Sequence, residues 1–348
     1  MINIGVIGCG KIAQVRHIPE YLDNKDCKLV GLYDLNLDRA KELAEKYGAK
    51  AYSSYEELLN DPSIDAVSIC TSNATHCEIA VKALEAKKHV LCEKPMAITL
   101  EECEKMVKAS HDNGRYLMIG QNQRLAKAHM VAREMVQSGK LGKVLSFRTT
   151  FGHGGPETWS IDAGKNTWFF SKQKAAMGAM ADLGIHKTDV IQYILGSKVY
   201  KTSAVLTTLD KRDGEGNLIE VDDNAICIYT MNDGVIGTMT ASWTFYGAED
   251  NSTIIYGTNG ILRLYDDVEN SVKWVHTDGS VECIEADKIQ TNDNQTKSGI
   301  IDAFIDCLVN DREPEISGDS VLSAMRAVFA SIESSEKHQE VVIEENKE

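Results

Sequence analysis

The stretch Ile4-Gly5-Val6-Ile7-Gly8-Cys9-Gly10-Lys11-Ile12-Ala13, near the start of the chain, decides the fold of the first part of this protein. It reads as a strand, a glycine turn and the start of a helix. In such a pattern Gly8 permits the tight turn, Gly10 lets a pyrophosphate approach the backbone, and Ala13 lets the helix pack closely on the strand. The N-terminus of that helix then faces the phosphates. The stretch therefore predicts a βα unit that binds a dinucleotide.

An acidic residue at the expected distance supports this prediction. Asp34 closes the next apolar run, 28–33. At about 20 residues beyond the turn, a carboxylate accepts hydrogen bonds from an adenosine ribose 2′-hydroxyl and repels a 2′-phosphate. The segment Leu35-Asn36-Leu37 supplies no cation to offset that charge, so we expect NAD to be preferred over NADP. The alternative is a structural βα turn followed by a surface aspartate.

Alternating strand and helix patterns extend to about residue 123. Short apolar runs with helical patterns between them predict a doubly wound parallel sheet, an α/β Rossmann domain over residues 1–123. Thr99 with Glu102 three residues later indicates a capping box, and Pro19 is expected to kink the first helix. The predicted strands are 2–7, 28–33, 65–70, 89–92 and 116–120.

The pattern changes to hairpins beyond about Leu145. Turn signals at 231–234, 257–260 and 277–280 separate β-rich runs, which predicts an α+β domain over 124–348 with a large, mostly antiparallel open sheet. Helices are expected near 180–195, 298–310 and 319–336, and the last is a candidate to pack back on the first domain. A sheet with helices on one side leaves its other face to be covered, so we expect a homodimer or homotetramer built on that face.

Composition excludes several classes of function. A chain of 348 residues suggests two domains. A formal net charge of -15 argues against nucleic acid and anionic membrane surfaces. Nine cysteines without a C-x-x-C pair fit reduced thiols and make structural zinc improbable. No apolar run approaches the roughly 18 residues of a membrane span, and a first strand at Ile2 leaves no room for a signal peptide, so we expect a cytoplasmic protein.

Residues that follow the strands are the ones to inspect, because ligands bind beyond the carboxyl ends of the strands in such a sheet. After the third run come Thr71, Asn73 and His76, small or polar side chains that could meet the cofactor, with plain helix capping as the alternative. After the fourth come Glu93 and Lys94. An ammonium there can hold a substrate hydroxyl and stabilise an alkoxide; the alternative is a surface lysine paired with Glu93.

A third candidate lies in the second domain. Asp182 and His186 are one turn apart on the same face of a predicted helix. A carboxylate beside an imidazole fixes its tautomer and supports it as a base near neutral pH. The alternatives are a metal pair, which lacks further ligands at the usual spacings, and a buried histidine satisfied by the aspartate. Together, a dinucleotide loop, a lysine and an Asp/His pair are the parts of an alcohol dehydrogenase that needs no metal.

The motifs Gly8-Cys9-Gly10, Glu93-Lys94-Pro95 and Asp182-Leu183-Gly184-Ile185-His186, in this order, resemble the Gfo/Idh/MocA oxidoreductases, which include inositol dehydrogenases and glucose-fructose oxidoreductases. The resemblance implies a Rossmann domain, a C-terminal domain on an open antiparallel sheet, and dimers or tetramers. It also implies that His186 accepts the proton, Asp182 is its partner and Lys94 orients and polarises the reacting hydroxyl. One departure is the segment 176–180, where many members carry a glycine-rich run.

These considerations define two sets of candidate residues. Trp168, with Phe169, offers a face on which sugar C–H groups could stack, although such aromatic pairs are more often core. The acidic background favours a neutral polyol or sugar over a sugar acid. The cofactor-binding set is Gly8, Cys9, Gly10, Lys11, Ile12, Asp34, Thr71, Asn73, His76, Glu93, Lys94 and Gln121, and the substrate-binding set is Lys94, Arg124, His153, Trp168, Lys174, Asp182 and His186, with no metal ligands.

The leading hypothesis is an NAD-dependent dehydrogenase that oxidises a secondary hydroxyl of a sugar or cyclitol, or reduces the keto-sugar. A second hypothesis is a glycosidase that uses bound NAD transiently, with oxidation, elimination and restoration of the cofactor. A third is a nucleotide-sensing protein on a dehydrogenase scaffold, because a fold alone does not establish chemistry.

Overall fold

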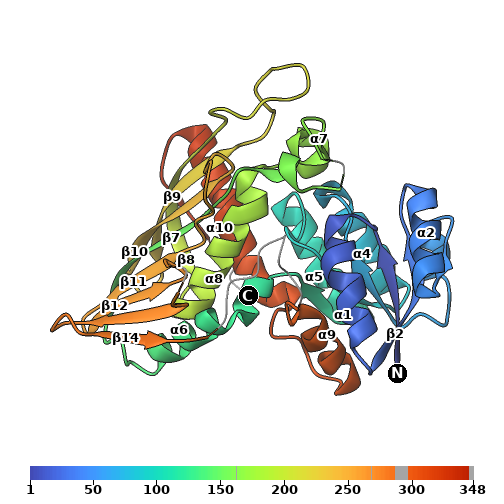
Figure 1. Ribbon diagram of the computed structural model, residues 1–348, viewed down its shortest axis with the longest axis horizontal. Helices are drawn as coiled ribbons and strands as arrows, with labels where there is room; N and C mark the ends of the chain where they lie inside the picture. Colours follow the sequence, from blue (N-terminus) through green and yellow to red (C-terminus); the bar gives the residue numbers. More distant parts are fainter. Residues whose placement is uncertain (162, 268, 287–296, 345–348) are drawn as a thin grey trace. The chain divides into compact units, whose positions relative to one another are not determined.

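The computed structural model describes residues 1–344, except residues 162, 268 and 287–296. By its contacts the chain divides into two compact units (Figure 1). The first contains Met1–Asn122, Trp159–Ile161 and the described residues 297–322. The second contains the remaining described residues. The sequence predicted a first domain over 1–123 and a second over 124–348, whereas the contacts place residues 297–322 in the first unit.

A six-stranded parallel sheet forms the centre of the first unit. Every neighbouring pair is parallel, and the order β3-β2-β1-β4-β5-β6 reverses direction at β1. This confirms the predicted doubly wound fold. The two-residue β3 was not predicted, because so short a strand has no readable alternation. The strands are β1 (Ile2–Ile7), β2 (Cys27–Tyr33), β3 (Lys50–Ala51), β4 (Ala66–Ile69), β5 (His89–Cys92) and β6 (Leu117–Ile119).

Helices connect these strands. Thr99 Oγ1 accepts a hydrogen bond from Glu102 N at 3.1 Å and caps its helix as predicted. Pro19 lies within a continuous helical segment, residues 11–23, directly after the π-helical turn Ala13–His17, and the kink expected at this proline stays a prediction. The helices are α1 (Ile18–Asp23), α2 (Leu37–Tyr47), α3 (Tyr55–Leu59), α4 (His76–Glu85), α5 (Leu100–Asn113) and α9 (Ile300–Val309).

A nine-stranded sheet forms the second unit, in the order β14-β13-β12-β11-β7-β10-β9-β8-β15. Its pairs are antiparallel except for β7 with β10. The three predicted turns join β9 to β10, β11 to β12 and β13 to β14, which confirms the hairpin pattern. The strands are β7 (Val144–Gly152), β8 (Val199–Thr207), β9 (Asn224–Met231), β10 (Ile236–Ser242), β11 (Thr253–Gly257), β12 (Gly260–Leu264), β13 (Val272–His276), β14 (Val281–Ile284) and β15 (Val341–Val342).

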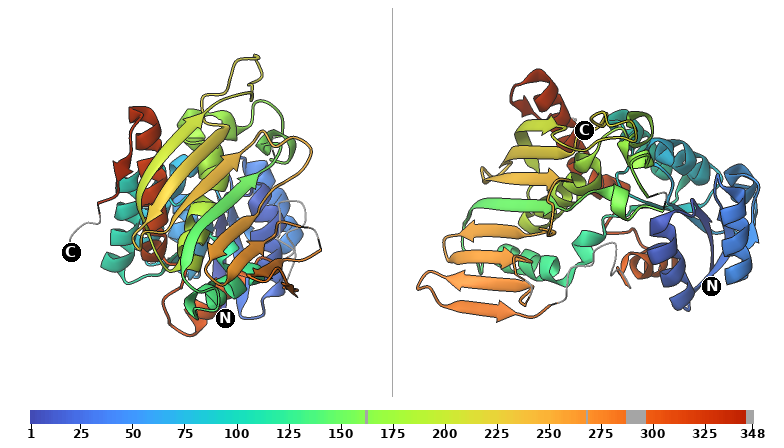
Figure 2. Two further views of the ribbon diagram at one scale, coloured as in Figure 1. Left: turned by 90° about the vertical axis from the view of Figure 1, so that its left-hand side faces the viewer. Right: turned by 45° about the horizontal axis from the view of Figure 1, so that its top comes forward.

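Helices lie on one face of this sheet, as Figure 2 shows. They are α6 (Lys127–Gln137), α7 (Lys172–Ala175), α8 (Ile185–Leu195) and α10 (Gly318–Lys337). The last part of α10 packs on β8 of its own unit, where Ser334 Oγ and Ser335 Oγ accept hydrogen bonds from Ala204 N and Leu206 N at 3.0 and 2.8 Å. The long last helix therefore packs on the sheet of the second unit, whereas α9 is the C-terminal helix that contacts β1 and α1.

The other face of the sheet carries exposed apolar side chains. Val205 on β8 pairs with Ile226 on β9, and both are more than half exposed, as are Ile228 and Ile236. Within β9, the exposed Ile226 and Ile228 alternate with Ala225, Cys227 and Tyr229, which are buried among the described residues.

None of the helices in the described part of the chain combines the length and apolar character that a bilayer-spanning helix needs.

Candidate active site

The two glycines of the turn after β1 have different surroundings. Gly8 has φ +93°, and a Cβ there would lie 2.7 Å from the carbonyl carbon and oxygen of Cys70, so only glycine fits. At Gly10 a Cβ would meet no heavy atom within 4 Å among the described residues. Lys11 and Ile12, which continue the turn, are partly exposed. Gly8 thus shapes the turn, and Gly10 leaves open space beside the backbone.

Asp34 is bound to the glycine turn itself. Its Oδ2 accepts a hydrogen bond from Cys9 N at 2.7 Å, and its Oδ1 accepts one from Asn36 N at 2.8 Å. Arg39 Nη1 lies 3.6 Å from Oδ1. The segment Leu35-Asn36-Leu37 supplies no cation, but Arg39, two residues further along the chain, places one beside Asp34. Asn36 caps α2 by accepting a hydrogen bond from Arg39 N at 3.2 Å, and this first helical turn brings the guanidinium back to the carboxylate.

His76 is the first residue of α4, the helix that follows β4, and is fully buried. Its Nδ1 lies 2.8 Å from Pro95 O and its Nε2 lies 3.2 Å from Thr71 O. Burial lowers the pKa of this imidazole, so the neutral ring donates to one carbonyl only. The ring ties the loop after β4 to the loop after β5, and a direct contact of His76 with a cofactor stays a prediction. Thr71 and the buried Asn73 lie in the same loop.

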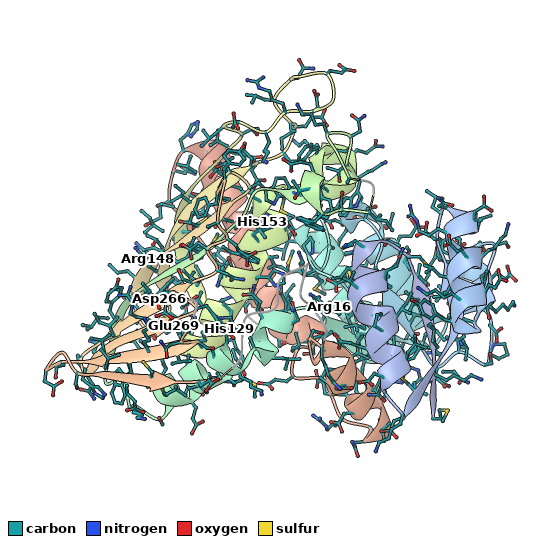
Figure 3. All side chains as sticks on the ribbon, viewed as in Figure 1. Arg16, His129, Arg148, His153, Asp266 and Glu269 are labelled. Atoms are coloured by element: carbon teal, nitrogen blue, oxygen red, sulfur yellow. The ribbon has the colours of Figure 1, made fainter. Side chains whose placement is uncertain are left out.

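Glu93 is the centre of a buried network beneath Lys94. Its Oε1 lies 2.8 Å from His17 Nε2 and 3.4 Å from Arg16 Nη1 (Figure 3 labels Arg16), and His17 Nδ1 lies 3.0 Å from Ser68 Oγ. Burial opposes ionisation of Glu93, but His17 and Arg16 outweigh it and hold the pKa of this carboxyl well below its usual value. Glu93 is 5% exposed, so its carboxylate belongs to the interior, and the role of Lys94 toward a substrate hydroxyl stays a prediction.

The turn that carries Lys94 is held by the same network. Lys94 N donates to Glu93 Oε2 at 3.2 Å, and the Lys94–Pro95 peptide bond is cis. The backbone of Lys94 is therefore fixed at the carboxyl end of β5, as a residue that acts on a ligand requires.

Gln121 follows β6 and has the clearest unmet bonding capacity in the first unit. It is 1% exposed, and neither its Nε2 nor its Oε1 has a hydrogen-bond partner in the described part of the chain. Buried amides are almost always hydrogen-bonded in proteins. Because a dinucleotide offers both donors and acceptors, the orphaned amide fits the predicted role of Gln121 in cofactor binding.

In the second unit, Asp182 and His186 lie on one continuous helix. Asp182 is in the π-helical turn Met180–Gly184, and His186 is in the first turn of α8. Both are buried, with 7% and 6% of their surface exposed. Asp182 Oδ2 accepts a hydrogen bond from Trp243 Nε1 at 3.1 Å. The predicted helix is confirmed, and the wider turn at its start carries the carboxylate.

A second carboxylate anchors the start of this helix. Asp222 accepts hydrogen bonds from Gly178 N and Met180 N, both at 2.7 Å. A Cβ on Gly178 would lie 1.8 Å from Asp222 O, so the segment requires glycine at this contact. Burial raises the pKa of Asp222 to about 6, although both amide donors lower it. Sequence reasoning missed Asp222 because it lies 44 and 42 residues from Gly178 and Met180, the residues whose backbone it binds.

The remaining predicted substrate residues have varied surroundings. His153 follows β7 (Figure 3); its Nδ1 accepts from Gly155 N at 2.9 Å, and its Nε2 lies 3.9 Å from Asp182 Oδ2. Trp168 stacks on Phe169 with ring centroids 3.9 Å apart. Lys174, on α7, is exposed. Only His153 is placed beside Asp182 by these contacts, and substrate binding by Trp168 and Lys174 stays a prediction.

Arg124 forms a buried ion pair. Its Nε and Nη2 donate to the two carboxylate oxygens of Asp189 at 2.7 and 2.5 Å, and its guanidinium lies over the Tyr193 ring. A bidentate pair of this kind fixes both side chains. The arrangement joins the segment before α6 to α8, and contact of Arg124 with a substrate stays a prediction.

The described residues contain no group of three or more His, Cys, Asp or Glu placed to hold a metal ion. What the described groups can do is transfer a proton and polarise a hydroxyl. An imidazole at His186, a carboxylate at Asp182 and an ammonium at Lys94 are the donor and acceptor types that such chemistry uses.

Comparisons with known proteins match both units. A model described as "Oxidoreductase family, NAD-binding Rossmann fold", of the Gfo/Idh/MocA group, matches residues 2–121, and a Gfo/Idh/MocA C-terminal domain model matches residues 129–263. Myo-inositol 2-dehydrogenase of Thermotoga maritima is 27% identical over 99% of both chains. Levoglucosan dehydrogenase of Pseudarthrobacter phenanthrenivorans is 32% identical over 66% of this chain and 63% of its own. A solved structure of a levoglucosan dehydrogenase with NADH and levoglucosan has a TM-score of 0.86 at 25% identity, covering 99% of each chain.

Proposed function

The chain belongs to the Gfo/Idh/MocA oxidoreductase family, and on this premise we propose that it is an NAD-dependent dehydrogenase that oxidises a secondary hydroxyl of a sugar or cyclitol, or reduces the corresponding keto-sugar. One observation carries the proposal: the buried Asp182 lies on the same helix as His186, and its carboxylate accepts a hydrogen bond from Trp243. Relatives named for myo-inositol and levoglucosan support the substrate class.

The residues of the first unit fit NAD. The glycine turn at Gly8 and Gly10 would receive the pyrophosphate, Asp34 would accept hydrogen bonds from the adenosine ribose, and Gln121 would bond with its orphaned amide. When bound, NAD takes up the hydride from the carbon that is oxidised. We propose a preference for NAD over NADP because the Asp34 carboxylate is bound to the glycine turn, with Asp34 Oδ2 2.7 Å from Cys9 N.

Three side chains would handle the proton and the oxygen. His186 accepts the hydroxyl proton during oxidation and returns it during reduction, as a general base and acid. Asp182 stabilises the imidazolium that forms. Lys94 donates a hydrogen bond to the reacting oxygen and stabilises its developing negative charge.

Assembly and location complete the proposal. The exposed apolar residues of β8, β9 and β10 support a homodimer or homotetramer formed through this sheet. All nine cysteines are free thiols, which supports a reducing, cytoplasmic location.

The test is NADH absorbance when purified protein with NAD is offered myo-inositol, levoglucosan, methyl glucosides, sugar acids and aryl glycosides. We expect NADH with a subset of the polyols or sugars, and we expect Lys94→Ala to abolish most of it while NAD binding persists. Release of an aryl group without net NADH, or full turnover in Lys94→Ala, contradicts the proposal.

A further inference from the structure

The carboxylate of Asp182 has a close neighbour in Trp243, the residue that follows β10. Trp243 is fully buried, and its Nε1 donates to Asp182 Oδ2 at 3.1 Å. Its backbone N donates to Asp223 O at 2.8 Å. Its ring packs against Phe169 and Phe170, with centroids 6.5 and 6.0 Å away. Main chain, ring and indole N–H are therefore all fixed.

His153 also lies near this oxygen, at a greater distance than Trp243. His153 Nδ1 accepts a hydrogen bond from Gly155 N, so a neutral His153 carries its proton on Nε2. That nitrogen is 3.9 Å from Asp182 Oδ2, beyond hydrogen-bond length. The indole N–H is within that length, and it is a donor that neither titrates nor rotates to another partner.

We propose that Trp243 is a positioning residue for the dehydrogenase reaction: its indole N–H holds the carboxylate of Asp182 in orientation and in its charged form beside His186. The proposal rests on the proposed function, in which Asp182 supports His186. A buried carboxylate is costly unless donors satisfy it, and a hydrogen bond to the charged form favours that form. The sequence does not show this contact, because Trp243 and Asp182 lie 61 residues apart in the chain.

The titratable groups around Asp182 come from three elements. His153 approaches from the end of β7, His186 from the next turn of the same helix, and Asp222 from the segment before β9, where it accepts from Met180 N. Each can change its charge with pH, whereas Trp243 cannot. A change that removes only the indole N–H therefore isolates the contribution of Trp243 from theirs.

The experiment compares Trp243→Phe with a matched control, Trp274→Phe. Trp274 on β13 is also buried, but its Nε1 has no hydrogen-bond partner among the described residues. Loss of a charge-assisted hydrogen bond predicts a kcat about tenfold to a hundredfold lower in Trp243→Phe. We expect the KM for NAD to stay the same, and we expect the fall of kcat/KM at acidic pH to begin at a higher pH. Trp274→Phe is expected to keep the wild-type kcat and the wild-type pH dependence of kcat/KM. The probes are myo-inositol, levoglucosan and methyl β-glucoside.

A spectroscopic readout tests the hydrogen bond without turnover. The chain has four tryptophans, so a ¹H–¹⁵N spectrum has four indole signals, and Trp243→Phe identifies one of them by its loss. Asp182→Ala is expected to shift that signal and to speed its exchange with solvent, leaving the Trp274 signal in place. If Trp243→Phe does not fold, the Phe variants of the other three tryptophans assign the signal by exclusion. An unmoved Trp243 signal in Asp182→Ala overturns the proposal.

The outcomes separate this inference from the proposed function. If Asp182→Ala and His186→Ala turn over the probes at the wild-type rate, the proposed roles of both residues are wrong, and this inference falls with them. If both variants lose turnover while Trp243→Phe keeps the wild-type kcat and pH profile, only the inference about Trp243 is wrong. If the wild type oxidises none of the probes, the proposed substrate class fails, and the indole signal alone decides whether Trp243 holds Asp182.

Discussion

The glycine turn of the first unit and the Asp182 helix of the second are both built around a carboxylate that accepts hydrogen bonds, but from partners at different distances along the chain. Asp34 is held by Cys9 N and Asn36 N, which belong to the same βαβ unit. Asp182 is held by Trp243, the residue after β10, which lies 61 residues away in the chain. The comparison teaches that the proposed cofactor site is held by residues close together in the sequence, whereas the proposed proton-handling site depends on long-range packing.

The largest expected effect distinguishes the two glycines of the turn. Gly8→Ala forces a Cβ into the Cys70 backbone at positive φ. We therefore expect the unfolding free energy to fall by about 3 kcal/mol or more, and we expect NAD binding to be lost as well. Gly10→Ala has room in the protein, so we expect stability within about 1 kcal/mol of wild type but weaker NAD binding. Urea unfolding and NAD titration measure both. Equal stability losses would show that Gly10 is structural too.

A buried lysine in the second unit predicts a pH-dependent stability. Lys187 is fully buried and donates to Asn251 O at 2.8 Å, and burial lowers its pKa to about 7 although Asp250 and Glu249 oppose this. Between about pH 7 and pH 10.5 the unfolded chain binds this proton and the folded chain does not, so folding stability rises with pH in that window.

Lys187→Met removes the proton that Lys187 takes up on unfolding. We expect the difference in unfolding free energy, wild type minus Lys187→Met, to rise by roughly 2–4 kcal/mol between pH 6 and pH 10. Urea denaturation at both pH values measures the difference, and Lys174→Met, at an exposed lysine, is the control. A constant difference across this range would mean that Lys187 stays charged in the folded protein.

The long-range support of Asp182 predicts a smaller effect at Asp222. Asp222→Ala removes the acceptor for Gly178 N and Met180 N, so we expect a loss of about 1–2 kcal/mol of stability, as for other helix caps. We also expect a lower kcat with an unchanged NAD affinity. Asp26→Ala, at an exposed turn residue, is the control. Were kcat to remain at the wild-type value, the start of the helix would not set the position of Asp182.

The smallest expected effect concerns the choice between NAD and NADP. Asp34→Ser removes the carboxylate that pairs with Arg39, and the guanidinium can then bind a 2′-phosphate, so we expect the NAD/NADP preference to fall by about tenfold. Asp34→Ser with Arg39→Ala should recover less NADP activity than Asp34→Ser alone. The kcat/KM ratio for the two cofactors measures both changes. An unaltered ratio in Asp34→Ser would show that Asp34 does not contact the ribose.

Local patterns predicted the parallel sheet, the hairpins and the positions of Gly8 and Asp34, because each depends on residues close together in the sequence. Arg39 was missed because the cap at Asn36 determines where its side chain lies. Trp243 and Asp222 were missed because only the folded sheet brings them to Asp182. Arg124 has the charge of a substrate ligand, yet Asp189, 65 residues away, binds it. Sequence spacing cannot reveal such pairs.

The central claim is that the first unit binds the cofactor and the Asp182–His186 helix handles the proton. The most direct test measures NAD affinity and NADH formation side by side in Gly10→Ala and His186→Ala. We predict that His186→Ala keeps wild-type NAD affinity and loses turnover by about 10²-fold or more, whereas Gly10→Ala loses NAD affinity. Wild-type turnover in His186→Ala, or a loss of NAD affinity there as large as in Gly10→Ala, would contradict the claim.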